Sequence, residues 1–440
     1  MNFAEAYNYL LSFQNLPRKE YMNDPRHCQI YLKRLQFFLN ILGNPEKKIP
    51  HYIHITGTSG KGSVVSFLHS ILHSAGKKVG STQSPHPTTI LERWKVGDHD
   101  MTEDEFVKLI KFVKPKLDEY TKKSPYDMLS FFELIEAIGF VYFANKKVEW
   151  LVLETGCGGR YDSTNVIPYK DVAVITNVGL DHVGIIGNNR EEIAYEKAGI
   201  IKKGCQAFTM EKNKKILDIF EKEAKRNKVT LHQISDNKYQ ITKSDLTGTS
   251  FIYKNLEYNL KNIGDHQTRN AILSIEVSIA LNIPLPTIKR GLKKTVQPLR
   301  MEIISNNPLV ILDGAHNQDK IKTTIETIQL INSSTYKQIH LIVGFSGNKD
   351  IKKMIKLLAK LEPESIACTR NTVNHFRKVA SPQDIAKLFR KNLSKNKIEI
   401  FLDPEDALTW SRKQAKKSNS LILVTGSIFL SGQLSKTIKN

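Results

Sequence analysis

The chain has 440 residues, of which 40% are hydrophobic and 25% are charged, which is ordinary for a soluble globular protein of two or three domains. Its four cysteines lie far apart, so we expect no disulfide framework and a cytoplasmic location. Its most apolar segment, Leu134–Ala144, is too short to span a bilayer, so we expect no membrane partner. The formal net charge is +21, but the lysines and arginines form no aromatic-interleaved stripe, so we expect no nucleic-acid partner.

Short apolar runs rich in valine and isoleucine recur between longer helical patterns. Near-continuous apolar strands that alternate with helices indicate parallel sheets covered on both faces. We therefore predict an α/β fold with an N-terminal, P-loop-type, doubly wound and mostly parallel sheet domain and a smaller C-terminal Rossmann-like α/β domain. The expected strands are Tyr52–Ile55, Val79–Thr82, Trp150–Glu154, Val172–Thr176, Leu309–Asp313, His340–Val343, Ile398–Leu402 and Leu421–Thr425.

The first of these strands leads through a glycine-rich turn into an amphipathic run from Ser63 to Ala75. Backbone N–H groups of such a loop point inward, and the dipole of the following helix adds positive potential. Lys61 can sit between the β- and γ-phosphates of a nucleotide, and the Ser63 hydroxyl can reach its Mg²⁺. The strict Walker pattern is not met, but the order of strand, lysine and helix favours nucleotide binding over an ordinary turn.

Polar residues follow the next three strands as well. Ser84-Pro85-His86 follows the second strand, Glu154 ends the third and opens the run Glu154–Asn165, and Asp181-His182 follows the fourth. In open α/β sheets the carboxyl ends of the strands form the ligand-binding edge, so we expect these residues to converge on the glycine-rich loop. Glu154 is then placed to hold Mg²⁺, beside the Ser84 hydroxyl and His182, and Arg160 can clamp a carboxylate or a phosphate.

Two later segments of the first domain carry weaker signals. Ile193–Lys202 is predicted to be a helix that ends at Gly199. Lys197 on this helix would usually be a solvated cation, and nothing in the local pattern favours another role. The polar stretch Asp236–Asn259 is expected to form β-hairpins or a loop excursion inside the first domain.

A boundary is expected near Arg300, because Pro298 interrupts a helical pattern and a new strand begins soon after it. We therefore divide the chain into a first domain over residues 1–300 and a second over residues 301–440. In the second domain Asp313 can hold a ribose or organise its loop, and His316 can meet an anion. Without further context this segment, like Gly426-Ser427, is interpreted as a structural turn.

The motifs taken together resemble one family, folylpolyglutamate synthase/dihydrofolate synthase, which is a branch of the Mur ligase superfamily. The resemblance runs from about residue 20 to about residue 430. The glycine-rich loop and the Ala315-His316-Asn317 turn are shared with Mur ligases generally, whereas Ser84-Pro85-His86 and Glu154–Asn165 are more particular to the folate branch. The motifs that carry it are Gly57–Ser63, Ser84-Pro85-His86, Glu92-Arg93, Glu154–Asn165, Asp181-His182, Lys197-Ala198-Gly199, Asp313–Asn317 and Thr425-Gly426-Ser427.

The resemblance implies an ATP-dependent ligase that adds L-glutamate to a pteroate or folate carboxylate through an acyl phosphate, for folate biosynthesis and retention. It implies two magnesium ions, of which Ser84, Glu154 and His182 would hold one. It also implies that Lys197 is carbamylated, which would turn a cation into a carboxylate that supports the second ion. The catalytic residues would be Lys61, Glu154, His182 and Lys197.

Further contacts follow from the same resemblance. A monomer is expected, with ATP, L-glutamate and folate or dihydropteroate as its ligands. The implied ATP contacts are Gly57, Thr58, Ser59, Gly60, Lys61, Gly62, Ser63, Asn270, Arg300 and Asp313. The implied folate or pteroate contacts are Leu129, Ser130, Phe131, Phe132, Arg160, Tyr161 and Asp162. The implied glutamate contacts are His316 and Ser427.

Two other hypotheses stay open. Another Mur-type ligase, acting on a cell-wall nucleotide precursor, would share the glycine-rich loop, although the Glu154–Asn165 run argues against it. A basic P-loop protein that binds nucleic acid would show salt-sensitive retention on DNA, but no groove-reading motif supports it. The sequence also leaves open whether the acceptor is dihydropteroate, a reduced folate or both, how long the polyglutamate chain grows, and which base deprotonates the incoming amine.

Overall fold

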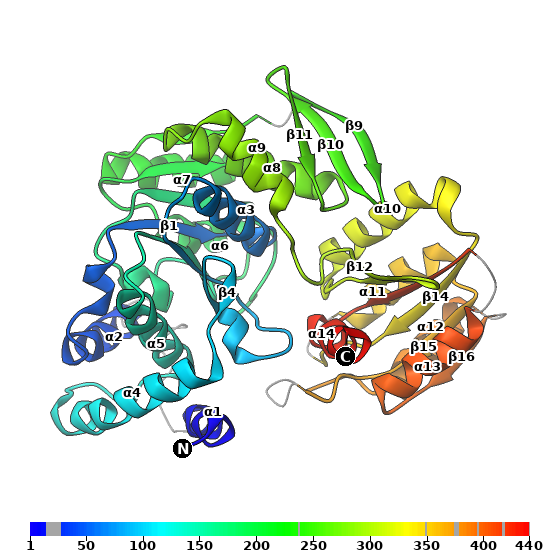
Figure 1. The fold of residues 1–440 in the computed structure, drawn as a ribbon, viewed down its shortest axis with the longest axis horizontal. Coiled ribbons are helices and arrows are strands. Elements are labelled where there is room, and N and C mark those ends of the chain that lie inside the picture. Colours follow the sequence, from blue (N-terminus) through cyan, green and yellow to red (C-terminus); the bar gives the residue numbers. More distant parts are fainter. Residues whose placement is uncertain are drawn as a thin grey trace. The chain divides into compact units, whose positions relative to one another are not determined.

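The structure is a computed structural model that describes residues 1–14, 28–235, 238–347, 350–373, 378–393, 396–415 and 419–439, without the side chains of residues 332–335. The chain forms two compact units (Figure 1). The first comprises Met1–His86, Leu91–Lys238 and Arg269–Lys294. The second comprises Pro87–Ile90, Tyr239–Thr268 and Thr295–Asn440.

The crossing at Thr295 lies close to the expected boundary near Arg300, but the chain also enters the second unit twice before it. The stretch expected to form hairpins inside the first domain is a three-stranded antiparallel sheet, apart from residues 236–237, which lie outside the described part of the chain. Its strands are β9 (Tyr239–Asp245), β10 (Gly248–Tyr253) and β11 (Leu256–Leu260). This sheet belongs to the second unit because β9 packs against α10 (Gln318–Thr335).

The first unit is built on a sheet with the strand order β4-β3-β2-β5-β1-β6-β7-β8 among the described residues. From β2 to β8 all neighbours are parallel, and only β3 runs antiparallel to its neighbours, β2 and β4. The sheet is therefore mostly parallel, as predicted. Its strands are β1 (His51–Thr56), β2 (Val79–Thr82), β3 (Trp94–Val96), β4 (His99–Asp100), β5 (Trp150–Glu154), β6 (Val172–Ile175), β7 (Gln206–Thr209) and β8 (Leu231–Gln233).

Helices cover both faces of this sheet, because its strands carry apolar residues on both sides. Val64, Leu68 and Leu72 of α3 pack with Leu273 and Val277 of α8 on one face. The apolar sides of α6 and α7 pack on the other face. The helices are α1 (Phe3–Ser12), α2 (Gln29–Ile41), α3 (Lys61–Ser74), α4 (Glu103–Lys123), α5 (Phe131–Asn145), α6 (Arg190–Ala198), α7 (Lys214–Asn227), α8 (Asp265–Ala280) and α9 (Leu285–Lys294), with short 3₁₀ helices at Pro45–Lys48, Ile90–Arg93 and Ser163–Val166.

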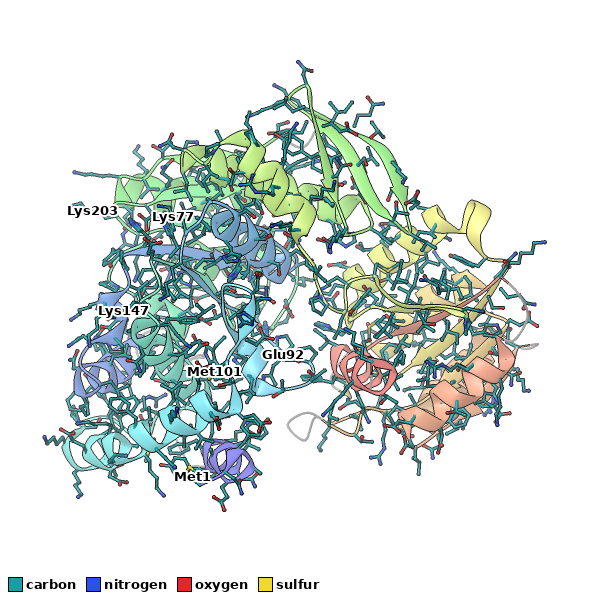
Figure 2. All side chains as sticks on the ribbon, in the orientation of Figure 1. Met1, Lys77, Glu92, Met101, Lys147 and Lys203 are labelled. Carbon is teal, nitrogen blue, oxygen red and sulfur yellow. The ribbon has the colours of Figure 1, made fainter. Side chains whose placement is uncertain are left out.

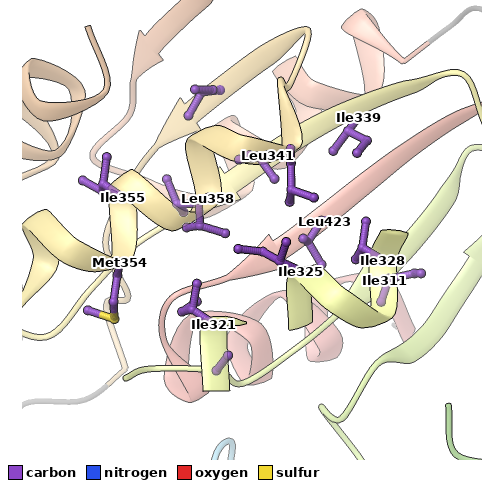
Figure 3. Close-up of a cluster of buried hydrophobic side chains, with 14 of the residues drawn as sticks. Ile311, Ile321, Ile325, Ile328, Ile339, Leu341, Met354, Ile355, Leu358 and Leu423 are labelled. Atoms are coloured by element: carbon purple, nitrogen blue, oxygen red, sulfur yellow. The ribbon is translucent and has the colours of Figure 1, made fainter. Parts of the chain in front are cut away.

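The second unit is built on a sheet with the order β12-β13-β17-β14-β15-β16 among the described residues, parallel except for β12. Figure 3 shows one side of it, where isoleucines of α10 meet Met354, Ile355 and Leu358 of α11. Helices α13 and α14 cover the other side. The elements are β12 (Glu302–Asn306), β13 (Leu309–Leu312), β14 (Gln338–Val343), β15 (Ser365–Cys368), β16 (Lys397–Ile400), β17 (Ser420–Thr425), α11 (Ile351–Leu358), α12 (Pro382–Asn392), α13 (Pro404–Gln414), α14 (Ile428–Lys439) and a 3₁₀ helix at Ala359–Leu361.

Several of the lysines that make the chain basic are exposed on the first unit. Figure 2 shows Lys77, Lys147 and Lys203, which are all exposed, on different parts of the first unit. Within the described residues, no helix combines the length and the apolar character needed to cross a membrane.

Candidate active site

The glycine-rich loop joins β1 to α3, and two of its glycines are required by close neighbours. Gly57 has φ +149°, and a Cβ there would lie 1.8 Å from the Thr176 hydroxyl oxygen. Gly60 has φ +83°, and a Cβ there would lie 2.4 Å from Asn270 Oδ1. A side chain at either position would therefore displace its neighbour. The structure thus brings Asn270 of α8 against the loop, and its role as an ATP contact stays a prediction.

Hydrogen bonds from the residues that follow β6 fix the conformation of the glycine-rich loop. Asn177 accepts the Ser59 N–H on its side-chain Oδ1 at 2.9 Å and the Thr58 N–H on its backbone carbonyl at 3.1 Å. The Thr176 hydroxyl donates to the Ser59 carbonyl at 2.6 Å. Sequence reasoning did not assign Asn177 a role. Its position directly after a predicted buried strand was the signal that could have found it.

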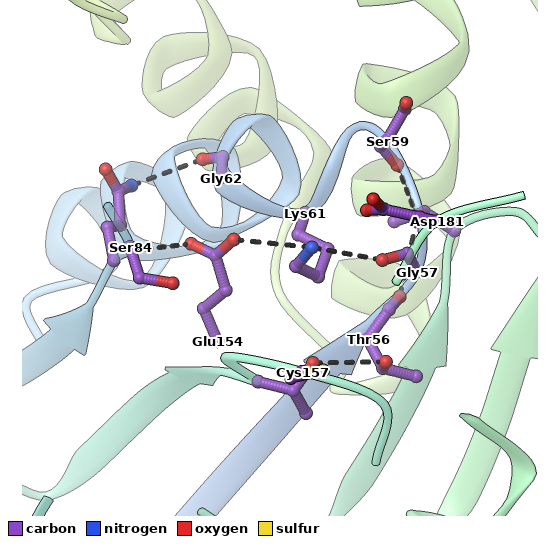
Figure 4. A network of polar contacts seen from close by, with 12 residues as sticks. Thr56, Gly57, Ser59, Lys61, Gly62, Ser84, Glu154, Cys157 and Asp181 are labelled. Carbon is purple, nitrogen blue, oxygen red and sulfur yellow. Dashed lines mark hydrogen bonds and ion pairs between the residues drawn. The ribbon is translucent and has the colours of Figure 1, made fainter. Parts of the chain in front are cut away.

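Lys61 and Glu154 lie together at the carboxyl edge of the first sheet (Figure 4). The Lys61 amine donates to the Gly57 carbonyl at 3.0 Å and lies 3.9 Å from Glu154 Oε1. The other carboxylate oxygen, Oε2, accepts the Ser84 N–H at 3.2 Å. Because β1 and β5 pair in parallel, with Ile55 opposite Glu154, the two strands end side by side. The expected convergence of Lys61, Ser84 and Glu154 is present.

A buried ion pair lies near Glu154. The Arg93 guanidinium lies 3.6 Å from the Glu136 carboxylate, and both side chains are buried. Burial raises the pKa of Glu136 to about 7, against the opposing effect of Arg93. Burial lowers the pKa of Arg93, while Glu136, Glu154 and Asp162 oppose that shift. Arg93 thus places positive charge near two predicted site carboxylates, a role that sequence reasoning did not assign.

His182 lies on the loop between β6 and α6. Its φ is +51°, a left-handed conformation that is uncommon for a residue other than glycine. Its Nε2 is 3.7 Å from Asp181 Oδ2, and about a third of its side chain is exposed (34%). His182 is therefore accessible to a ligand, and its predicted metal role remains a prediction.

Lys197 is buried on α6, with 3% of its surface exposed. Burial, together with the nearby positive charge of Lys61, lowers the pKa of its amine to about 7. The expectation of an ordinary solvated cation, drawn from the local pattern, is therefore wrong. An amine with this pKa is largely uncharged just above neutral pH, which is the form that reacts with CO₂.

The run after Glu154 is folded around internal partners. Arg160 pairs with Glu223 at 2.8 Å and places its guanidinium 4.0 Å from the ring centroid of Tyr195. Asp162 accepts the Cys157 N–H at 2.8 Å and the Thr164 N–H at 3.0 Å. These contacts give both residues a structural role. Their predicted contacts with a pteroate, like that of the partly buried Tyr161, stay predictions.

The segment Leu129–Phe132 leads into α5, which begins at Phe131. Ser130 caps this helix through a reciprocal pair of hydrogen bonds with Glu133. The fully buried Arg34 of α2 donates to both carboxylate oxygens of Glu133, at 2.9 and 2.5 Å. Leu129 and Phe131 are buried, whereas Phe132 is 58% exposed. Of this predicted pteroate segment, Phe132 therefore offers the largest free apolar surface.

In the second unit Asp313 is buried and organises its own turn. One of its oxygens accepts the Ala315 N–H and the Thr324 hydroxyl, and the other accepts the Met301 N–H. These partners match the loop-organising alternative that the sequence allowed. The predicted ATP contact of Asp313 stays a prediction.

The remaining predicted residues of the second unit lie at turns. His316 Nδ1 donates to the Gly314 carbonyl at 2.8 Å, and Lys320 donates to its Nε2 at 3.2 Å. Arg300 donates to the Leu299 carbonyl at 3.0 Å. The Ser427 hydroxyl accepts the Leu430 N–H at the start of α14.

The side chains around Glu154 determine which metal ion the site can hold. Within the described residues, no group of three or more His, Cys, Asp or Glu side chains is placed to hold one. Mg²⁺ does not need such a cluster, because it usually keeps several waters and takes one or two carboxylates together with phosphate oxygens. Glu154, which lies beside Ser84 and the phosphate-type loop, fits this sparse pattern.

Comparison with known proteins gives two family matches that together span most of the chain. Residues 55–278 match the Mur ligase middle domain, and residues 299–428 match the Mur ligase glutamate ligase domain. A dihydrofolate synthase/folylpolyglutamate synthase of Bacillus subtilis (strain 168) is 33% identical, over 93% of this chain and 95% of that protein.

Solved structures agree with these matches. The crystal structure of a folylpolyglutamate synthase from Thermotoga maritima superimposes with a TM-score of 0.82 at 28% identity, over 100% of this chain and 97% of that one. An FPGS–AMPPCP complex gives a TM-score of 0.80 at 25% identity, over 100% of both chains.

Proposed function

The chain belongs to the folylpolyglutamate synthase/dihydrofolate synthase family of the Mur ligase superfamily, and on this premise we propose that it joins L-glutamate to the carboxylate of a pteroate or folate at the expense of ATP. The contact between the Lys61 amine and the Glu154 carboxylate, at the end of two parallel strands, carries this proposal. It supports one site for a triphosphate and a divalent ion. The relatives are named as folate enzymes, which argues against the cell-wall alternative.

ATP is proposed to bind at the loop Gly57–Ser63. Support comes from the glycine-rich turn between β1 and α3, from the N-terminus of α3, whose dipole favours an anion, and from Asn270 beside Gly60. A related structure holds AMPPCP, an analogue in which the β,γ-bridging oxygen of ATP is replaced by carbon. Arg300 and Asp313 are proposed as further ATP contacts.

We further propose that Ser84, Glu154 and His182 hold Mg²⁺, which when bound would neutralise charge on the phosphate oxygens. Carbamylated Lys197 is proposed to support a second ion. The pteroate is proposed to contact Leu129–Phe132 and Arg160–Asp162, and L-glutamate to contact His316 and Ser427. We also propose that the first domain ends at residue 300, that the protein is a monomer and that it is located in the cytoplasm.

The proposed reaction has two steps. The acceptor carboxylate attacks the γ-phosphorus of ATP, so that an acyl phosphate forms and ADP leaves. The uncharged amine of L-glutamate then displaces phosphate and forms the amide. A carboxylate and a triphosphate repel each other, so the site must supply positive charge; the Lys61 amine is placed to bind the γ-phosphate as negative charge moves onto the leaving ADP.

A phosphate-release assay with a panel of pteroates and folates, with and without L-glutamate, tests this function. We expect release that depends on both acceptor and L-glutamate, and the active acceptor distinguishes dihydropteroate from reduced folate. Nucleotide-sugar acceptors serve as the control. Release with those acceptors, or release indifferent to L-glutamate, would contradict the proposal.

A further inference from the structure

A buried lysine that the proposed reaction does not use lies beneath the Glu154–Asn165 run. Lys170 is 2% exposed. Its amine contacts His54 Nδ1 at 2.6 Å and donates to Asn165 Oδ1 at 3.0 Å. His54 Nε2 in turn lies 2.8 Å from the Thr164 hydroxyl, which donates to Asp162. A chain of four buried side chains thus connects Lys170 to Asp162.

The direction of these hydrogen bonds can be derived from the Asp162 end. Burial raises the pKa of Asp162, but three hydrogen bonds, from the Cys157 N–H, the Thr164 N–H and the Thr164 hydroxyl, oppose that shift and favour the ionised, acceptor-only form. The single hydroxyl hydrogen of Thr164 is therefore used, so its oxygen must accept from His54.

His54 then carries its hydrogen on Nε2. Burial, together with Lys170 and Lys202, lowers the pKa of His54 well below its ordinary value, so the ring is neutral. Its Nδ1 is consequently bare and accepts from Lys170. An amine donates in either protonation state, so every donor along the chain points toward Asp162.

The second bond of Lys170 leads to the helix that carries Lys197. Asn165, which accepts from Lys170, donates to the Gly199 carbonyl at 3.1 Å and to the Arg160 carbonyl at 3.0 Å. Gly199 caps the C-terminus of α6, two residues after Lys197. One buried amine therefore holds both the Glu154–Asn165 run and the end of α6.

We propose that Lys170 is a positioning residue of this ligase, which acts through His54 and Thr164 to fix Asp162 and through Asn165 to fix the end of α6. The inference rests on the proposed function, because it assigns Lys170 a role in that same site. Lys170 is too deeply buried to meet a substrate, so its effect must pass through the residues that it holds.

The matched variants Thr164→Val and Thr164→Ser test the hydrogen bonds between Lys170 and Asp162 with little change in side-chain volume. Valine removes the hydroxyl, whereas serine keeps it. Misplacement of a positioned group by about 1 Å can cost about 100-fold in activity, so we expect Thr164→Val and Lys170→Met to lower kcat by about 10-fold or more. Thr164→Ser should stay close to wild type. KM for ATP should change little, since the Lys61 and Asn177 contacts are untouched.

The tautomer of His54 provides a readout that does not depend on activity. Nitrogen NMR of the ¹⁵N-histidine-labelled full chain, assigned with His54→Gln, should show hydrogen on Nε2 in the wild type. Hydrogen on Nδ1 would overturn the inference, even if the valine and methionine variants failed to fold. A folded Thr164→Val with wild-type kcat would overturn it as well. Absence of ligation by the wild type would instead refute the proposed function.

Discussion

Lys61 is the residue on which the phosphate site depends most directly. We expect Lys61→Ala to lower ATP turnover by about 10²-fold or more, because it removes the only side-chain ammonium of the Gly57–Ser63 loop from a site where negative charge develops. The fold should be kept, since among the described residues the amine donates to the Gly57 carbonyl alone and faces Glu154 at 3.9 Å. Steady-state phosphate release and a thermal melt measure the two effects.

Lys77→Ala is the matched control, because Lys77 is an exposed lysine just beyond the end of α3. It should leave both activity and melting unchanged. Ligation retained by Lys61→Ala would contradict the assignment of the phosphate site.

Lys197 should respond to CO₂. Its pKa of about 7 leaves the amine largely uncharged at pH 8, where it can form a carbamate. We expect kcat to fall after incubation in CO₂-free buffer at pH 8 and to recover with bicarbonate, whereas Lys197→Met should show no response. A wild type indifferent to bicarbonate would contradict the modification.

The same pKa fixes the sign of a stability effect in the unmodified protein. In the unfolded chain the amine returns to its ordinary pKa of 10.5, so between pH 7 and that value the unfolded state binds more protons than the folded state. The free energy of unfolding of CO₂-free wild type should therefore rise with pH in this window relative to Lys197→Met. Urea unfolding of both proteins at pH 7 and pH 9 measures it.

At the scale of elements, the turn from β1 into α3 depends on Gly60 for two separate reasons. Its left-handed φ costs a larger residue about 1–2 kcal/mol, and a Cβ would lie 2.4 Å from Asn270 Oδ1. Gly76, at φ +76°, has nothing within 4 Å of the corresponding position, so Gly76→Ala carries the first cost alone. We expect Gly60→Ala to raise KM for ATP by about 10-fold or more, because Asn270 must move or the loop must shift.

Gly76→Ala should lose stability without a change in KM. Steady-state kinetics and urea unfolding of both variants separate the effect of backbone strain from the effect of a steric clash with Asn270. Equal KM values for the two variants would show that the contact with Asn270 does not matter for ATP binding.

The same scale shows what the sequence could predict. Buried parallel strands are continuous apolar runs, so β1, β5, β6, β13 and β17 were predicted within a residue or two. Because those strands are parallel, the meeting of Lys61 with Glu154 followed from their order. Local patterns could not predict which unit the β9–β11 sheet joins, since its packing against α10 is a contact between distant segments.

The interaction partners of individual side chains could not be predicted from local patterns for a similar reason. The pairing of Arg160 with Glu223 joins residues 63 positions apart, and an arginine in a glycine-rich run looks free to bind a ligand until the fold is known. The burial of Lys197 likewise depends on how α6 packs, which made a local interpretation of it as a surface cation wrong.

At the scale of the whole molecule, metal and nucleotide should stabilise the protein jointly. Anything that binds only the folded state raises its stability by mass action, by about 2.7 kcal/mol when the ligand is at 100 times its Kd. Glu154 supplies one carboxylate beside the phosphate loop, so nucleotide affinity should depend on Mg²⁺.

We expect EDTA to abolish phosphate release and to remove most of the rise in melting temperature that AMPPCP with Mg²⁺ produces. Glu154→Gln, which keeps the shape but not the charge, should show the reduced rise even with Mg²⁺ present. A rise of equal size with EDTA, or in Glu154→Gln, would mean that this carboxylate does not hold the ion.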